Sequence, residues 1–188
     1  MNHQEIALPG QISGVVPSLS LRAELGPPRS ECGIGGLIAW ADKLWAMTYL
    51  SHRKGTGSGT GLYEIDENLR MVKRPESYPG TYANRYVHVQ SNQLFIGPWV
   101  IDAQRKVRTI KALLDVRLAG TATHLTDPQN KVLFLGMEGE FLEVDVHTLE
   151  VTRLFDLCQV LETPGEGRVH WKDIYTAFGR VVVADNTY

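Results

Sequence analysis

Short apolar runs separated by polar turn signals fill the chain from residue 33 onward. Most runs are about four to eight residues long and are rich in Val, Ile, Leu, Tyr and Trp, as β-strands typically are. We expect strands at 36–40, 43–50, 62–66, 70–73, 86–89, 93–96, 99–102, 106–110, 122–125, 131–135, 141–146, 149–154, 174–178 and 180–184. No window has a clear helical period, so only short helical turns are expected, within 111–118 and 154–161. The pattern predicts an all-β protein.

A strand–turn–strand unit recurs along the chain. The runs 62–66, 98–102 and 141–145 each end in an aspartate (Asp66, Asp102 and Asp145), and each is followed by a short polar turn and a second apolar run. An aspartate in this position can accept hydrogen bonds from the backbone amides of the turn. The units recur about every 40 residues, which is the period of four-stranded propeller blades. The repeat therefore predicts a β-propeller of four-stranded antiparallel blades.

The strands after residue 33 suffice for about three and a half blades, and two arrangements remain open. We favour an N-terminal fragment of a seven-bladed ring, and the alternative is a four-bladed ring closed by residues 10–25. Residues 1–32 are a Pro- and Gly-rich N-terminal segment that could supply a ring-closing strand, and residues 33–188 form the partial propeller. A β-sandwich is the other fold compatible with many short strands.

Composition and charge exclude several classes of partner. The formal net charge is −2 and the pI is about 6.3, so no overall basic field exists to bind nucleic acid or an anionic membrane. No apolar run approaches the ~20 residues of a membrane-spanning helix. Residues 1–20 have no signal-peptide pattern, so the location is unknown, and it would be periplasmic or secreted if the true N-terminus is missing. The two cysteines are too few for a disulfide framework.

Blade topology is expected to gather polar side chains on one face. In each blade, the connection between the second and third strands and the connection to the next blade emerge on the same side. Histidines, arginines and tyrosines are concentrated in these connections. His52, Tyr82, Arg85 and His88 are candidate members of a functional site on this face. The predicted substrate-binding residues are Arg53, Lys54, Asn84, His124, Arg168 and His170.

The side chains of this face suit an acidic oligo- or polysaccharide. Arginine forms bidentate hydrogen bonds with carboxylates, and histidine exchanges protons near neutral pH. Trp99 or Trp171 could stack on a sugar ring. No pair of histidines has the close spacing of metal ligands, and the glycine-rich loop 55–61 lacks the spacing of a phosphate-binding loop. We expect neither a metal nor a cofactor.

The stretch 32–45, Cys-Gly-Ile-Gly-Gly-Leu-Ile-Ala-Trp-Ala-Asp-Lys-Leu-Trp, resembles the opening blade of seven-bladed bacterial propellers that attack acidic glycans. So does the stretch from Ser-His-Arg-Lys-Gly at 51–55 to Gly-Thr-Gly-Leu-Tyr-Glu-Ile at 59–65. The similar families are the rhamnosyl-glucuronate hydrolases of glycoside hydrolase family 145 and the related propeller polysaccharide lyases. The resemblance covers about residues 33–188 and implies cleavage of rhamnose–glucuronic acid linkages. It implies that His52 corresponds to the hydrolases' catalytic histidine, and that Tyr82, Arg85 and His88 are similar to a lyase set.

Elimination and an unusual histidine-dependent hydrolysis both remain open. A lyase removes the proton α to the uronate carboxylate, so it needs a His or Tyr base and a cation that neutralises the carboxylate. A hydrolase usually needs two carboxylates, and the polar loops carry no convincing pair. The alternative to an enzyme is a non-catalytic propeller that binds a glycan or a protein partner.

Overall fold

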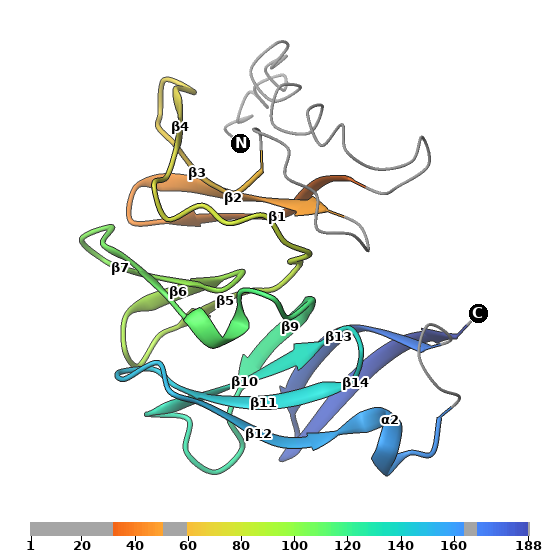
Figure 1. The fold of residues 1–188 in the computed structure, drawn as a ribbon. Coiled ribbons are helices and arrows are strands. Elements are labelled where there is room, and N and C mark those ends of the chain that lie inside the picture. The colour runs from red at the N-terminus through yellow and green to blue at the C-terminus, as the bar shows by residue number, and fades with distance from the viewer. Residues whose placement is uncertain (1–31, 51–59, 164–168, 188) are drawn as a thin grey trace, which may run out of the picture.

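The chain forms consecutive antiparallel β-sheets in the computed structural model, which describes residues 32–50, 60–163 and 169–187 (Figure 1). The first sheet contains β1 (Cys32–Trp40), β2 (Lys43–Leu50), β3 (Leu62–Ile65) and β4 (Met71–Lys73). The second contains β5 (Arg85–His88), β6 (Gln93–Ile96), β7 (Trp99–Asp102) and β8 (Val107–Thr109). The third contains β9 (Leu118–Thr123), β10 (Lys131–Gly136), β11 (Glu140–Asp145) and β12 (Val151–Asp156). The fourth is the hairpin of β13 (Val169–Ala177) and β14 (Arg180–Thr187).

Two short helical segments interrupt the strands of the described residues. The 3₁₀ turn η1 (Lys111–Leu113) lies between β8 and β9, and helix α2 (Leu157–Val160) follows β12. Asp156 caps α2, because its side chain accepts hydrogen bonds from the amides of Cys158 and Gln159. The predictions of an all-β fold and of helical turns within 111–118 and 154–161 are therefore confirmed.

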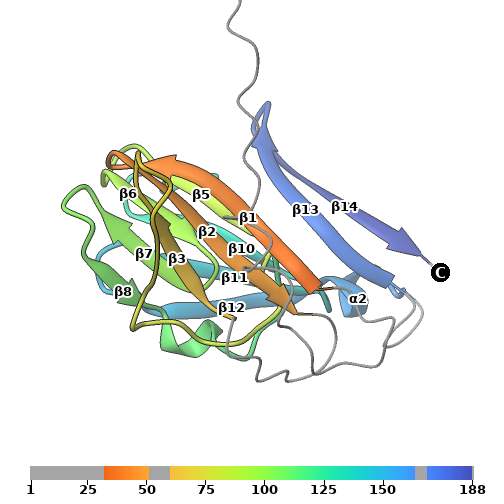
Figure 2. The same ribbon diagram turned by 90° about the horizontal axis from the view of Figure 1, so that it is seen from above.

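Each four-stranded sheet is a meander in which the strands pair in the order of the chain. Figure 1 shows the sheets following one another as separate layers, and in Figure 2, seen from above, the first three sheets overlap with the β13–β14 hairpin to one side. The hairpin contacts the third sheet through β13 and β9. Such serial four-stranded sheets are consistent with propeller blades. A β-sandwich is excluded, because it consists of two facing sheets. Closure into a seven-bladed ring stays a prediction, since the described sheets do not close on themselves.

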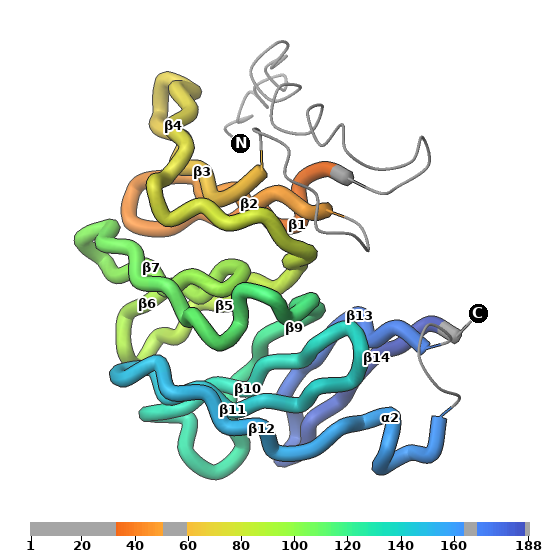
Figure 3. Tube along the Cα trace, viewed as in Figure 1, coloured from red at the N-terminus to blue at the C-terminus, as the bar shows by residue number. Residues whose placement is uncertain are grey.

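The first strands of the four sheets, β1, β5, β9 and β13, lie next to one another, and we call them the inner strands. Backbone hydrogen bonds join the second sheet to the third at this side. The amide of Leu118 donates to Thr81 O at 2.9 Å, and the amide of Ala83 donates to Leu118 O at 2.9 Å. Tyr82 and Leu118 form a parallel bridge between them. The trace in Figure 3 shows how the connection before β5 runs beside the start of β9.

The repeated aspartates close equivalent turns, as the sequence predicts. Oδ1 of Asp66 accepts from the amides of residues 68 and 70, and Oδ1 of Asp102 accepts from those of residues 104 and 106. Oδ1 of Asp145 accepts from the amides of residues 147 and 148. The bond from the Thr148 amide is the main cause that lowers the pKa of Asp145 below its ordinary value. The three turns thus share an aspartate that accepts from the turn amides, and the third turn is one residue longer than the others.

The main core lies between the sheets. Trp45, Met47 and Leu62 of the first sheet pack with the apolar side chains of the second sheet, and these in turn pack with Val132 and Phe134 of the third. A second cluster between the third sheet and the hairpin contains Leu135, Phe141, Trp171 and Ile174. In β6 and β7 consecutive residues belong to the main core, because successive side chains point to opposite faces and the second sheet is covered on both.

Of the N-terminal segment 1–32, proposed as a source of a ring-closing strand, Cys32 begins β1 and residues 1–31 lie outside the described residues. Among the described helices, none combines the length and the hydrophobicity that crossing a bilayer requires.

Candidate functional site

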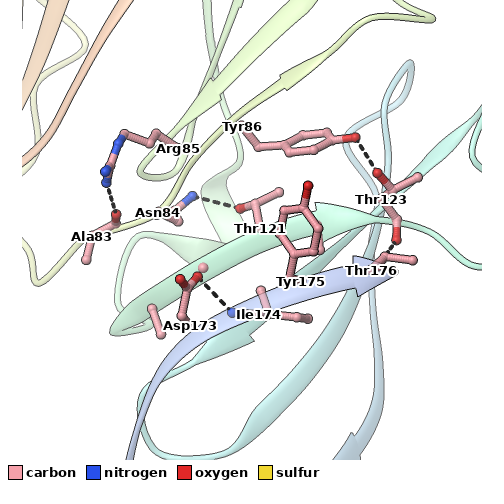
Figure 4. A pocket seen from close by; sticks show the side chains of 13 residues that line it. Ala83, Asn84, Arg85, Tyr86, Thr121, Thr123, Asp173, Ile174, Tyr175 and Thr176 are labelled. Atoms are coloured by element: carbon pink, nitrogen blue, oxygen red, sulfur yellow. Dashed lines mark hydrogen bonds between the residues drawn. The ribbon is translucent and has the colours of Figure 1, made fainter. Parts of the chain in front are cut away.

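A pocket opens where the inner strands of the second, third and fourth sheets meet (Figure 4). Its volume is about 290 Å³, near the lower end of the ~300–1,000 Å³ range of small-molecule sites. We call it the inner-strand pocket. β9 lies between β5 and β13, so residues of the second and fourth sheets line opposite sides. The lining residues are 83–86, 119–123 and 173–176.

Arg85 gives the pocket its positive charge. Its side chain is exposed, and Nη1 donates one hydrogen bond to Ala83 O at 3.3 Å. Arg85 forms no ion pair with any residue that the structure describes. Because a guanidinium has five N–H donors, most of its hydrogen-bonding capacity is available to a ligand.

Asn84 lines the pocket beside Arg85 but is held by the protein. The residue is 1% exposed, and Nδ2 donates to Gly97 O at 3.0 Å and to Thr121 Oγ1 at 3.1 Å. Its carbonyl Oδ1 is buried and lacks a hydrogen-bond partner in the structure. These two hydrogen bonds hold the second sheet against β9. Because Arg85 follows Asn84 in the chain, they also fix the position of Arg85.

Hydroxyl groups line the end of the pocket away from Arg85. Tyr86 Oη and Thr123 Oγ1 are 2.7 Å apart. Thr176 Oγ1 donates to Thr123 O at 2.6 Å. Figure 4 shows this group and the Arg85 guanidinium at opposite ends of the pocket. The pocket therefore has a cationic end and a hydroxyl-rich end.

β13 supplies a carboxylate and an aromatic ring. Oδ1 of Asp173 accepts from the Ile174 amide at 2.8 Å, and no ion pair involves Asp173 in the described part of the chain. Tyr175 is 72% exposed. Gly120 permits the close approach of β13 to β9, because an added Cβ would lie 2.8 Å from Ile174 Cγ2.

Tyr82, a predicted catalytic residue, lies in the core and does not line the pocket. It is 0% exposed, and its phenol donates to Leu114 O at 2.5 Å. Burial raises the pKa of Tyr82 well above its usual range. Trp99 and Trp171 are buried as well, so the expectation that one of them stacks on a sugar ring is wrong.

His88 and His124 lie at the other ends of their strands, away from the connections between sheets. His88 is the last residue of β5, so its expected position in such a connection is wrong. It is fully buried, with Nδ1 2.6 Å from Ser91 Oγ and Nε2 2.9 Å from Pro128 O. His124 follows β9, and its Nε2 is 2.9 Å from Glu143 Oε2. The His88 side chain bonds to two turns and the His124 side chain bonds to β11, and neither lines the inner-strand pocket.

We expect His88 to make the protein less stable in mild acid. Burial is the main cause that lowers the pKa of His88 below 6.5, and the charge of nearby His147 acts in the same direction. Below pH 6.5 the unfolded chain therefore binds a proton that the folded His88 does not. The free energy of unfolding should fall as the pH decreases from 6.5 toward the folded pKa of His88. Above pH 6.5 the histidine is neutral in both states and this loss of stability is absent.

Urea unfolding of the native chain and of His88→Gln at pH 7.5 and 5.5 measures this effect. The variant should lose less stability between the two pH values than the native chain loses. An equal loss in both proteins would show that other groups cause the acid sensitivity.

The remaining predicted residues divide between a buried position and segments that the structure does not describe. His170, the second residue of β13, is buried, and its Nε2 lies 4.0 Å from Oε1 of Glu138, which also pairs with Arg117. His52, Arg53, Lys54 and Arg168 lie outside the described residues. Of the ten predicted site residues, the structure thus places Asn84 and Arg85 together in the pocket.

Sequence reasoning missed Tyr86, Asp173, Tyr175 and Thr176. Asp173 and Tyr175 are alternate residues of one strand, and an exposed tyrosine within a predicted strand is a detectable signal. What the sequence could not indicate is that this strand lies beside β9 opposite β5. No cluster of three potential metal ligands occurs among the residues that the structure describes.

Comparisons with protein-family models and with curated proteins find no match for this chain. The geometry of the pocket is therefore the basis for any assignment of function.

Proposed function

We propose that this protein binds a carboxylate-bearing saccharide, with one uronate residue in the inner-strand pocket. The observation that carries the proposal is Arg85, an exposed guanidinium without an ion-pair partner among the described residues, at one end of a pocket of sugar size. Arginine binds carboxylates through paired hydrogen bonds. The exposed ring of Tyr175 and the hydroxyls of Tyr86 and Thr123 add an apolar surface and polar partners for a sugar ring.

The volume argues for a single sugar residue. A pocket of about 290 Å³ is too small for several sugar rings in a row, so the rest of an oligosaccharide would lie outside it. The ligand class is then acidic saccharides that present one uronate to the pocket. A neutral glycan would leave the charge of Arg85 without a partner.

Titration calorimetry with methyl glucuronide and methyl glucoside tests the proposal. The native chain should bind the glucuronide, and Arg85→Ala should weaken binding by about tenfold or more, because a charged hydrogen-bonding group is lost. Arg85→Lys, which keeps the charge but loses the paired geometry, should lie between the two. The glucoside should bind weakly and equally to all three proteins. Binding of glucuronide that is independent of Arg85 would refute the assignment.

Cleavage of a rhamnose–glucuronic acid linkage is a second candidate, and one observation favours it. Leu50 ends β2 immediately before the segment that contains His52, and it is tied to the connection leading to Arg85. Its amide donates to Gly80 O at 3.1 Å, and its carbonyl accepts from Thr81 Oγ1 at 2.5 Å. In this candidate function Arg85 would stabilise the charge that develops as the α-proton leaves, and His52 would act as the base or as the hydrolytic residue.

Products from a panel of rhamnose–uronate polymers separate the possibilities. Elimination would give an unsaturated uronate with a new ultraviolet absorbance, and hydrolysis would release sugar without it. His52→Ala should abolish the product in either case. Arg85-dependent binding with neither product would leave a binding protein.

A further inference from the structure

The two charged residues of the inner-strand pocket stand on different strands and are not paired with each other. Arg85 begins β5 and Asp173 lies in β13, with β9 between these strands. Opposite charges in a pocket of about 290 Å³ would attract each other, yet no ion pair within 4.0 Å joins them. Separate positions of this kind suit a ligand with different groups at its two sides.

One carboxylate oxygen of Asp173 accepts a hydrogen bond from the protein, and the other accepts none from the described residues. Oδ1 accepts from the Ile174 amide at 2.8 Å, and it would lie 3.2 Å from a Cβ added at Gly120. Asp173 is exposed and pairs with Ala184 across the hairpin, so the neighbouring strand offers it no polar side chain. Oδ2 has no hydrogen bond to any described residue, and an ionised carboxylate can only accept.

We propose that Asp173 determines the specificity of the pocket by accepting hydrogen bonds from the hydroxyls of the bound uronate. This inference rests on the proposed function, in which Arg85 holds the sugar carboxylate. The ligand would then lie across β9 with its carboxylate toward β5 and its hydroxyl edge toward β13. Tyr175, two residues after Asp173, would contact the ring.

The charge of Asp173 also defines what the pocket rejects. A sulfate ester on the hydroxyl edge replaces a hydrogen-bond donor with an anion, which the carboxylate would repel. The ligand class is therefore a uronate with free hydroxyls, and sulfated uronates are excluded. The Asp173 carboxylate would both accept from the hydroxyl and repel a sulfate at that position, so one substitution of Asp173 changes both interactions.

The test compares methyl glucuronide with its 3-O-sulfate by titration calorimetry. The native chain should prefer the unsulfated sugar by roughly tenfold or more, because a charged hydrogen bond is exchanged for a like-charge contact. Asp173→Asn keeps the shape and an acceptor for the Ile174 amide but removes the charge. Its preference for the unsulfated sugar should fall several-fold, mainly through tighter binding of the sulfate. If Asp173 had a purely structural role, Asp173→Asn would weaken the binding of both sugars equally. That result would overturn the inference.

A matched variant and a third ligand complete the design. Lys172→Gln changes a neighbouring exposed charge of the same strand that does not line the pocket, so it should leave the sulfate discrimination unchanged. A 3-amino-3-deoxy uronate should bind the native chain more tightly than the hydroxyl form does, because its ammonium donates a charged hydrogen bond to the carboxylate, and Asp173→Asn should remove this gain. Equal binding of the two forms by the native chain would contradict the contact with Asp173. If glucuronide binds and depends on Arg85 while Asp173→Asn leaves the discrimination intact, only this inference fails. If glucuronide binding does not depend on Arg85, the proposed function itself fails.

Discussion

Gly35→Ala is expected to lower the free energy of unfolding by about 3 kcal/mol, because it forces two backbone segments apart. A Cβ at residue 35 would lie 1.9 Å from the carbonyl oxygen of Tyr82 and 3.1 Å from Tyr49 Cβ. The nearest atom belongs to the backbone, which cannot move aside as a flexible side chain can. Gly35 thus permits the contact between β1 and the connection that leads to β5. Urea unfolding monitored by tryptophan fluorescence measures the loss.

Gly179→Ala is the matched control for the close approach. Gly179 lies in the β13–β14 turn with φ +69°, and an added Cβ there would meet no atom within 4 Å. Its substitution should cost about 1 kcal/mol through backbone conformation alone. If Gly35→Ala costs no more than Gly179→Ala, the contact between β1 and Tyr82 is not rigid.

Trp99→Ala is expected to cost about 3–5 kcal/mol, as large-to-small substitutions of buried aromatic residues do. Trp99 is 0% exposed and packs edge-on against Tyr82, with ring centroids 5.5 Å apart. Its indole N–H donates to Glu76 O at 2.9 Å. The indole therefore connects β7 with the segment between β4 and β5, and it packs in the core of the second sheet. Denaturant unfolding followed by far-ultraviolet circular dichroism measures the change.

Trp99→Phe separates the contribution of packing from that of the hydrogen bond. The smaller ring retains much of the apolar contact but leaves Glu76 O without its donor, so the loss should be intermediate. A Trp99→Ala variant of native stability that no longer binds glucuronide would contradict the core assignment. In that case Trp99 would be a ligand contact.

The strands and their turns could be predicted because both depend on local sequence. Apolar runs of strand length identify the sheets, and the aspartates at 66, 102 and 145 close their turns through amides only two to four residues away. The expected strand positions agree with the observed ones to within a few residues for most strands. β1, β9 and β13 begin earlier than expected, because glycine, threonine or charged residues interrupt the apolar pattern near the start of each strand.

The site could be predicted only in part, because three sheets contribute to it. Arg85 and Asn84 follow from the concentration of polar residues before β5. Tyr82 stands in the same connection, but the segment packs against the third sheet and buries it. The sequence predicts that His88 shares the face of Arg85, but β5 begins at Arg85 and ends at His88, so the two residues lie at opposite ends of the strand. Asp173 and Tyr175 lie in the site only because β13 contacts β9.

The order of the strands bears on how the chain acquires its structure during synthesis. Each sheet is built from neighbouring stretches of the chain, so little loop-closure entropy opposes its formation. A sheet can therefore form while later ones are still unsynthesised, as expected of repetitive architectures that grow from unit to unit. The hydrogen bonds of Leu118 with Thr81 and Ala83 form when the third sheet begins to emerge. The residues that line the pocket consequently come together only when β13 reaches β9.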